Sequence, residues 1–161
     1  MTPLVSIIMG STSDLPVMEK AARQLDELAI PFEILALSAH RTPDEVAQFA
    51  REAKAKGVRV IIAGAGMAAH LCGVIASMTP LPVIGVPIKA TLDGMDALLA
   101  IVQMPPGING AQNAALLAAQ MLSLGDADLM ERLKAFKEGL KEKVVRANAD
   151  LKEVKYRFKT N

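Results

Sequence analysis

The sequence has little of the residues on which several classes of protein depend. Of its 161 residues, one is cysteine (Cys72), two are histidine and none is tryptophan. A single cysteine forms no internal disulfide and, by itself, no zinc cluster; it is typical of a reducing compartment, so we expect a cytoplasmic protein. Eighteen Lys and Arg against seventeen Asp and Glu give a net charge of +1, which argues against a dedicated nucleic-acid or membrane-surface binder. The expected ligand is a small molecule.

Long runs without charge do occur, but they do not have the pattern of membrane spans. Residues 60–88 and 97–125 contain no Asp, Glu, Lys or Arg. Several glycines and prolines interrupt both runs, so neither run could satisfy its backbone in lipid as one helix. The first residues lack a basic segment followed by a long apolar one, so we expect no secretory signal. Both runs are expected to be buried elements of a soluble protein.

Short apolar runs alternate with segments of helical periodicity. The runs predict strands at residues 5–9, 32–37, 58–63 and 82–86 and, more weakly, at 101–103. Thr42, Pro43 and Glu45 match a capping box, which predicts the start of a helix. The alternation predicts an α/β fold of three layers, α/β/α, with a flavodoxin-like, doubly wound parallel sheet of about five strands.

We expect residues 1–125 to form the catalytic domain and residues 126–161 to be a C-terminal helical extension of it. In the extension, apolar residues recur at steps of three and four, as in one long helix or two. This helix either packs one stripe against its own domain or clasps a neighbouring subunit. Residues 111–124 are apolar on nearly every side, whereas a surface helix of a small monomer has a polar face. Another subunit is expected to cover them.

In open parallel sheets, ligands bind beyond the carboxyl ends of the strands. Three loops in such positions are unusual, and together they hold both histidines: residues 10–14 (Gly-Ser-Thr-Ser-Asp), 38–41 (Ser-Ala-His-Arg) and 64–70 (Gly-Ala-Gly-Met-Ala-Ala-His). The first loop offers hydroxyls and amides to a phosphate and a carboxylate to ribose hydroxyls, although Ser13 or Asp14 could instead cap the next helix. In the second loop, His40 stands beside the fixed cation Arg41, which favours a binding or catalytic role.

The third loop matches Gly-x-Gly-x-x-Ala through Gly64, Gly66 and Ala69. A dinucleotide fingerprint belongs after the first strand and needs an acidic residue about twenty positions later, so we expect Gly66 to line a smaller ligand instead. His70 is either a core histidine or a ligand contact. Cys72 is expected to be a core residue rather than a nucleophile. Two histidines and one cysteine offer no convincing metal site, so no metal is expected.

Four segments stand in a characteristic order and spacing: residues 10–14, 38–43, 63–71 and 113–120. Together they resemble the class I N5-carboxyaminoimidazole ribonucleotide mutase family of purine biosynthesis, over nearly the whole chain through about residue 124. The resemblance implies a flavodoxin-like subunit and an octamer with active sites at subunit junctions. It also implies the conversion of N5-carboxyaminoimidazole ribonucleotide to 4-carboxy-5-aminoimidazole ribonucleotide without metal or organic cofactor.

The same resemblance assigns roles to residues of the three loops. It implies substrate binding by Ser11, Asp14 and Arg41, general acid/base catalysis by His40, and a place in the same pocket for Ser38 and His70. Imidazole suits this chemistry because its reference pKa near 6.5 lets it give and take a proton at neutral pH.

The chain departs from the family pattern at three places. Met67 stands where the family usually has glycine, Cys72 where it usually has proline, and Ile108 runs directly into Asn109 where the family carries a further short run. Two alternatives follow: a non-catalytic nucleotide- or phosphate-binding α/β module, or the related class II carboxylase, which takes free aminoimidazole ribonucleotide and carbon dioxide. Arg41 argues against the latter, because that class typically has lysine there.

Overall fold

A parallel sheet forms the centre of the chain. The computed structural model describes residues 2–27, 30–103, 120, 123–155 and 160. Over this part the sheet contains the strands β1 (Val5–Met9), β2 (Phe32–Ala36), β3 (Val60–Gly66) and β4 (Val83–Ile88). They pair in the order β2-β1-β3-β4, all parallel. The predicted flavodoxin-like order is confirmed for these four strands.

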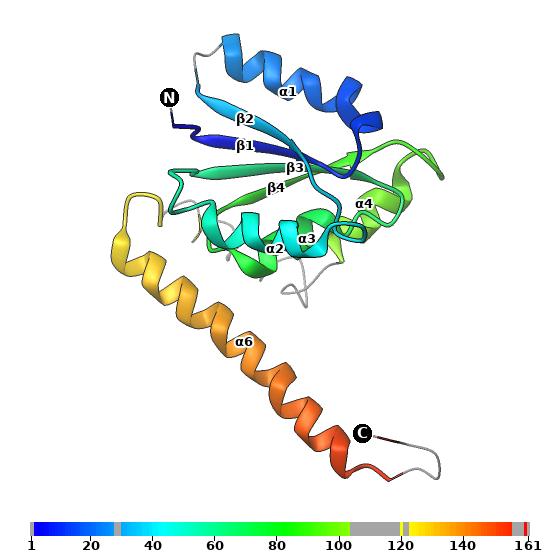
Figure 1. Ribbon diagram of the computed structural model, residues 1–161, viewed down its shortest axis with the longest axis vertical. Coiled ribbons are helices and arrows are strands. Elements are labelled where there is room, and N and C mark those ends of the chain that lie inside the picture. The colour runs from blue at the N-terminus through cyan, green and yellow to red at the C-terminus, as the bar shows by residue number, and fades with distance from the viewer. Residues whose placement is uncertain (1, 28–29, 104–119, 121–122, 156–159, 161) are drawn as a thin grey trace.

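Helices cover both faces of the sheet. The described residues form the 3-10 helix η1 (Thr12–Asp14) and the helices α1 (Leu15–Glu27), α2 (Pro43–Glu52), α3 (Leu71–Met78), α4 (Met95–Val102) and α6 (Ala127–Glu153). Figure 1 shows α1 on one face and α2, α3 and α4 on the other. The predicted three-layer α/β/α arrangement is therefore confirmed.

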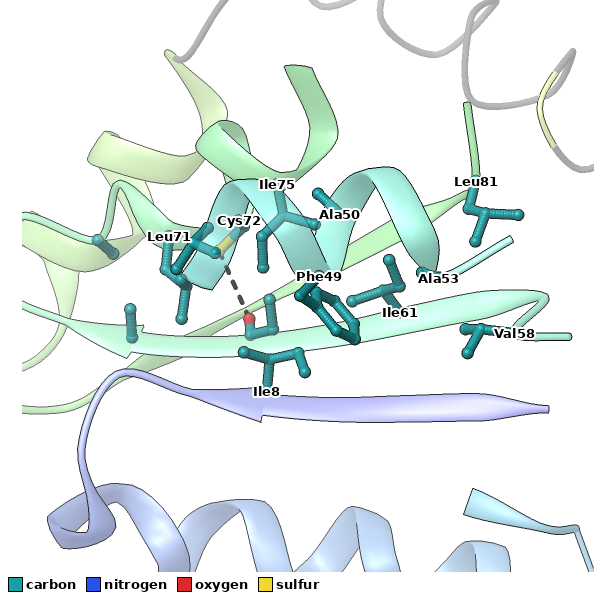
Figure 2. Close-up of a cluster of buried hydrophobic side chains, with 14 of the residues drawn as sticks. Ile8, Phe49, Ala50, Ala53, Val58, Ile61, Leu71, Cys72, Ile75 and Leu81 are labelled. Atoms are coloured by element: carbon teal, nitrogen blue, oxygen red, sulfur yellow. Dashed lines mark hydrogen bonds between the residues drawn. The ribbon is translucent and has the colours of Figure 1, made fainter. Parts of the chain in front are cut away.

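Each face of the sheet has its own hydrophobic core. Ile7 and Ile8 are adjacent in β1 and both fully buried, because alternate side chains of a strand point to opposite faces. Ile7 packs with Met18 of α1, and Ile8 packs with Phe49 of α2 (Figure 2). Burial of side chains of this size contributes roughly 1.5–3 kcal/mol each, so the two cores hold the strand ends in fixed positions.

Cys72 belongs to the core between the sheet and α3. Its side chain is buried, and its Sγ donates a hydrogen bond to the carbonyl oxygen of Ala63 at 3.4 Å (Figure 2). Burial raises the pKa of the thiol, which disfavours the nucleophilic thiolate. The prediction of a core cysteine is confirmed.

The predicted fifth strand at residues 101–103 is wrong. Ile101 and Val102 are the last two residues of α4. A short apolar run does not distinguish a strand from the end of a buried helix, and here the helical alternative holds. Gly85 of β4 provides the space, because a Cβ there would lie 2.9 Å from Cγ2 of Ile101.

The capping box at the start of α2 is correct in position but not in its hydrogen bond. Thr42 is the N-cap, yet its side chain makes no capping bond to the helix. Its Oγ1 instead accepts from the backbone N–H of Ser38 at 2.9 Å and donates to the carbonyl oxygen of Ser38 at 3.2 Å. The hydroxyl closes the 38–42 turn and so fixes the loop that carries His40.

Over its described residues, the C-terminal extension contains a single helix, α6 (Ala127–Glu153). Asp126 caps it by accepting from the N–H of Leu129 at 2.9 Å, and Met130 and Leu133 are buried near its start. Farther along, apolar side chains such as Val144 are exposed, and Figure 1 shows the helix running away from the sheet. Among the described residues, the buried side chains of α6 lie in its first turns, so an arm that clasps a neighbour remains a prediction.

Two other predictions fall largely outside the part that the structure describes. Apart from residues 120, 123 and 124, the apolar segment 111–124 lies outside the described residues. The junction between Ile108 and Asn109 does so as well. Among the described helices, none is long and apolar enough to cross a membrane.

Lys137 ties α6 to the body of the domain. Its Nζ donates to the carbonyl oxygens of Ala76 and Thr79, at the C-terminal end of α3. The last carbonyls of a helix lack partners within the helix, and a cation is favourable beside them. Burial nevertheless lowers the pKa of Lys137 to about 8.

This lowered pKa predicts a pH-dependent stability. Lys137 loses its proton near pH 8 in the folded chain but only near pH 10.5 when unfolded, so the unfolded state binds more protons between these values. The free energy of unfolding of the wild type, relative to Lys137→Met, should therefore rise from pH 8 to pH 10.5. We expect a rise of roughly 2 kcal/mol in urea titrations, below the full value because the side chain is partly exposed.

Lys141→Met is the matched control. Lys141 lies on the same helix, is exposed and pairs with Glu138 at 2.8 Å. The difference in the free energy of unfolding between Lys141→Met and the wild type should stay constant over the same pH range. A flat difference for Lys137→Met as well would show that the ammonium group is not desolvated in the folded protein.

Candidate active site

A cleft of about 580 Å³ opens beyond the carboxyl ends of the strands. All seven residues expected at the site line it: Ser11, Asp14, Ser38, His40, Arg41, Gly66 and His70. Gly66 is the last residue of β3, and the other six come from the segments that follow β1, β2 and β3, which are neighbours in the sheet. Because parallel strands end at the same edge, three loops far apart in the sequence meet there.

The two histidines form a pair across the cleft. Nε2 of His40 lies 2.9 Å from Nδ1 of His70, within hydrogen-bond distance, and the rings meet edge to face at 89° with their centroids 5.1 Å apart. One ring must donate and the other accept, so the contact holds one proton between two imidazoles. This arrangement favours proton transfer to a group bound beside it.

His70 ends the third loop. It is the N-cap of α3. Strand β3 continues to Gly66, and a tight turn follows in which the N–H of His70 donates to the carbonyl of Ala68 at 2.8 Å. The half-buried side chain lines the cleft, so the core-histidine alternative is wrong.

Arg41 is held in place from two sides. Its Nη2 donates to the carbonyl oxygen of Gly10 at 2.7 Å, and its Nε lies 3.4 Å from Oγ of Ser38. The guanidinium thus bridges the ends of β1 and β2. A fixed planar cation with further donors is suited to a phosphate or carboxylate.

Hydroxyls and a carboxylate follow β1. Ser11 caps η1: its Oγ accepts from the N–H of Ser13 at 3.3 Å and from Oγ of Ser13 at 2.9 Å. Asp14, the last residue of η1, also lines the cleft. Serine hydroxyls beside Arg41 can donate to a phosphate, and a carboxylate can accept from ribose hydroxyls.

The third loop is strained at Met67. Its φ of +54° is in the left-handed region, which costs a residue other than glycine about 1–2 kcal/mol. Its side chain is 59% exposed and lines the cleft. The backbone therefore keeps a conformation that glycine adopts freely, although methionine stands there.

The sequence prediction missed residues at the end of β4, namely Ile88, Lys89 and Ala90, which also line the cleft. The strand prediction ended at residue 86, two residues before the observed end, and no ligand role was considered beyond it. A signal was present: Lys89 is the first charged residue after the long uncharged run 60–88, at the carboxyl end of a strand. The other three loops of the cleft also lie at the carboxyl ends of parallel strands, where ligands bind in open sheets.

Metal binding finds no support in the geometry. Within the described residues, no group of three or more His, Cys, Asp or Glu side chains lies close enough to hold a metal ion. The described residues that line the cleft with the histidine pair include the cations Arg41 and Lys89. Among them, no carboxylates lie close enough to the histidines to complete a group of metal ligands. The absence of a metal from the reaction stays a prediction.

Comparisons with known proteins agree over most of the chain. The model of the AIR carboxylase family matches residues 4–143. A Pyrococcus horikoshii protein named N5-carboxyaminoimidazole ribonucleotide mutase is 52% identical over 160 residues, covering 94% of this chain and 90% of the relative. The 160 positions of this alignment exceed the number of residues in the aligned 94% of this chain. The relative therefore contains residues that have no counterpart in this chain.

Two further relatives carry related names. A Candida glabrata phosphoribosylaminoimidazole carboxylase is 48% identical over 96% of this chain, but this chain covers 28% of that protein. A crystal structure of Treponema denticola PurE has a TM-score of 0.61 and 32% identity, covering 94% of this chain and 99% of that one. The match of the family model and the 52% identity to a relative of nearly equal length lead to one conclusion: the chain belongs to the AIR carboxylase family.

Proposed function

We propose that this protein is an N5-carboxyaminoimidazole ribonucleotide mutase of purine biosynthesis. It would convert N5-carboxyaminoimidazole ribonucleotide to 4-carboxy-5-aminoimidazole ribonucleotide. The observation that carries the proposal is the His40–His70 pair in a cleft that also holds Arg41, Asp14 and serine hydroxyls. The Pyrococcus horikoshii relative of this name supports it.

Binding follows from the polar groups at the β1 and β2 ends of the cleft. Arg41, bridging Gly10 and Ser38, takes the phosphate together with Ser11. Asp14, on the same loop as Ser11, accepts from the ribose hydroxyls. The aminoimidazole ring then reaches toward the histidine pair and the loop that contains Gly66.

Proton transfer by His40 completes the reaction. The bond between the exocyclic nitrogen and the carboxyl carbon breaks, carbon dioxide forms, and His40 gives a proton to that nitrogen. Ring carbon four then forms a bond to the carbon dioxide and loses its own proton to His40. Protons given and taken balance, so one imidazole suffices, and general acid/base catalysis of this kind contributes about 10²- to 10⁴-fold.

Recapture requires that carbon dioxide stays beside the ring. The cleft walls next to the histidines include Ala65 and Ala68, small apolar residues that offer no competing nucleophile. A partner subunit would close the cleft further. We accordingly propose a homo-oligomer, an octamer as the family resemblance implies, that acts in the cytoplasm, with residues 1–125 as its catalytic domain.

One experiment tests the function and the absence of a metal together. The purified chain, incubated with either carboxylated ribotide in EDTA and without ATP, should interconvert the two, and the chelator should leave the rate unchanged. Loss of activity in EDTA that zinc restores would contradict the metal-free mechanism. Turnover of free aminoimidazole ribonucleotide with carbon dioxide, but not of the N-carboxylated ribotide, would favour the carboxylase alternative.

A further inference from the structure

Lys89 stands at the opposite end of the cleft from Arg41. It follows β4, whereas Arg41 follows β2, and the sheet order β2-β1-β3-β4 separates these strands by three steps. At about 4.8 Å per step the two strand ends lie roughly 14 Å apart. Both side chains line the same cleft, and they are the two Lys or Arg residues among its described lining.

The backbone places the Lys89 segment against the third loop. A Cβ on Gly66 would lie 3.2 Å from the carbonyl oxygen of Ile88 and 3.4 Å from Cβ of Ala90. Glycine at position 66 therefore lets the chain around Lys89 approach the loop that leads to His70. This contact brings the backbone on either side of Lys89 against the end of β3.

The turn that follows Lys89 is strained, and it pairs the Lys89 ammonium group with a carboxylate. Leu92 and Asp93 adopt positive φ values of 45° and 55°, which are uncommon for residues other than glycine. The turn brings Asp93 close to Lys89, and Oδ1 of Asp93 lies 2.6 Å from Nζ of Lys89. Both side chains are more than 70% exposed, and an exposed ion pair of this kind contributes little, so a ligand anion can replace Asp93 readily.

The charges of the cleft match those of the proposed substrate. A carboxylated ribotide carries a phosphate at one end and a carboxylate on the base at the other, with ribose between. The described lining has one fixed cation at the serine-rich end, Asp14 on that same loop, and Lys89 beyond the histidines. Arg41 and the serines serve the phosphate, which leaves the carboxylate without a cation unless Lys89 provides it.

We propose that Lys89 binds the carboxylate of the carboxylated ribotide and so makes the site selective for carboxylated over uncarboxylated ribotides. This inference rests on the proposed function and extends it to a residue at the β4 end of the cleft. During the reaction Lys89 would orient the carboxyl group toward the histidine pair. It moves no proton.

Calorimetric titration with two ribotides tests the proposal. Lys89→Gln should weaken the binding of 4-carboxy-5-aminoimidazole ribonucleotide about ten-fold or more, the usual effect of losing a charge-assisted hydrogen bond. It should change the binding of 5-aminoimidazole ribonucleotide, which lacks the carboxylate, less than about two-fold on the same grounds. Arg41→Lys should weaken both ribotides, because both carry the phosphate.

Lys56→Gln is the matched control. Lys56 pairs with Glu52 at 2.7 Å, four residues away as Asp93 is from Lys89, but it does not line the cleft. The control should leave both affinities unchanged, and Lys89→Arg should keep most of the affinity for the carboxylated ribotide. If Lys89→Gln weakened the binding of both ribotides equally, or weakened the binding of neither, the role proposed for Lys89 would be overturned while the proposed function would stand. A wild type that binds neither ribotide would overturn the proposed function as well.

Discussion

Replacing His40 with Asn is expected to lower kcat for the interconversion of the two carboxylated ribotides by about 10³-fold or more, in the range of general acid/base contributions. Asn keeps a hydrogen-bonding side chain but cannot carry a proton between nitrogen and carbon. His40 lies in a loop and is not part of either core, so the fold should be intact. Steady-state kinetics and circular dichroism measure the two effects.

His70→Asn separates the catalytic role from the positioning role. It removes the 2.9 Å contact to His40 but leaves the imidazole of His40 in place. We expect a loss of about ten-fold in kcat, because the remaining imidazole loses its hydrogen-bonded partner. Near-normal activity of His40→Asn would contradict the assignment of the general acid/base.

The second large effect is expected from a charge in the apolar segment 111–124. Leu117→Asp should shift the mass measured by light scattering toward smaller species and lower the activity at the same time. The segment lacks a polar face, and burying a Leu or Met side chain contributes roughly 1.5–3 kcal/mol, so a few such residues per subunit would hold an assembly. A shared cleft would lose activity when the subunits separate.

Leu4→Asp is the comparison for this test. Leu4 is 42% exposed in the described chain and precedes β1, away from the loops of the cleft. The same Leu-to-Asp exchange there should leave the mass and the activity close to those of the wild type. A monomeric wild type with full activity would contradict both the covered helix and the shared site.

The strands and the cleft loops were predictable because their signals are local. Alternating apolar runs gave the positions of β1, β2, β3 and β4 to within two or three residues. Gly10, His40 and Gly66 could be placed near the carboxyl ends of strands from the run boundaries. The parallel topology then required those ends to meet at one edge.

Other features depended on contacts between distant residues. Ile101, at the end of α4, packs against Gly85 of β4, and the Thr42 hydroxyl bonds to the backbone of Ser38 rather than to its own helix. Neither partner is visible in a local pattern, because hydrophobic periodicity records how often apolar residues recur and not what they touch.

The sequence by itself determined the fold class, the three loops and the chemical types of group in the site. Tertiary structure alone decided that His40 and His70, thirty residues apart, share a hydrogen bond, and that Lys89 lines the same cleft. The physical reason is that the chemical type of each side chain is a property of its own residue and can be read from the sequence. Distances between side chains are set by strand order and by the packing of both cores, which involve the whole chain.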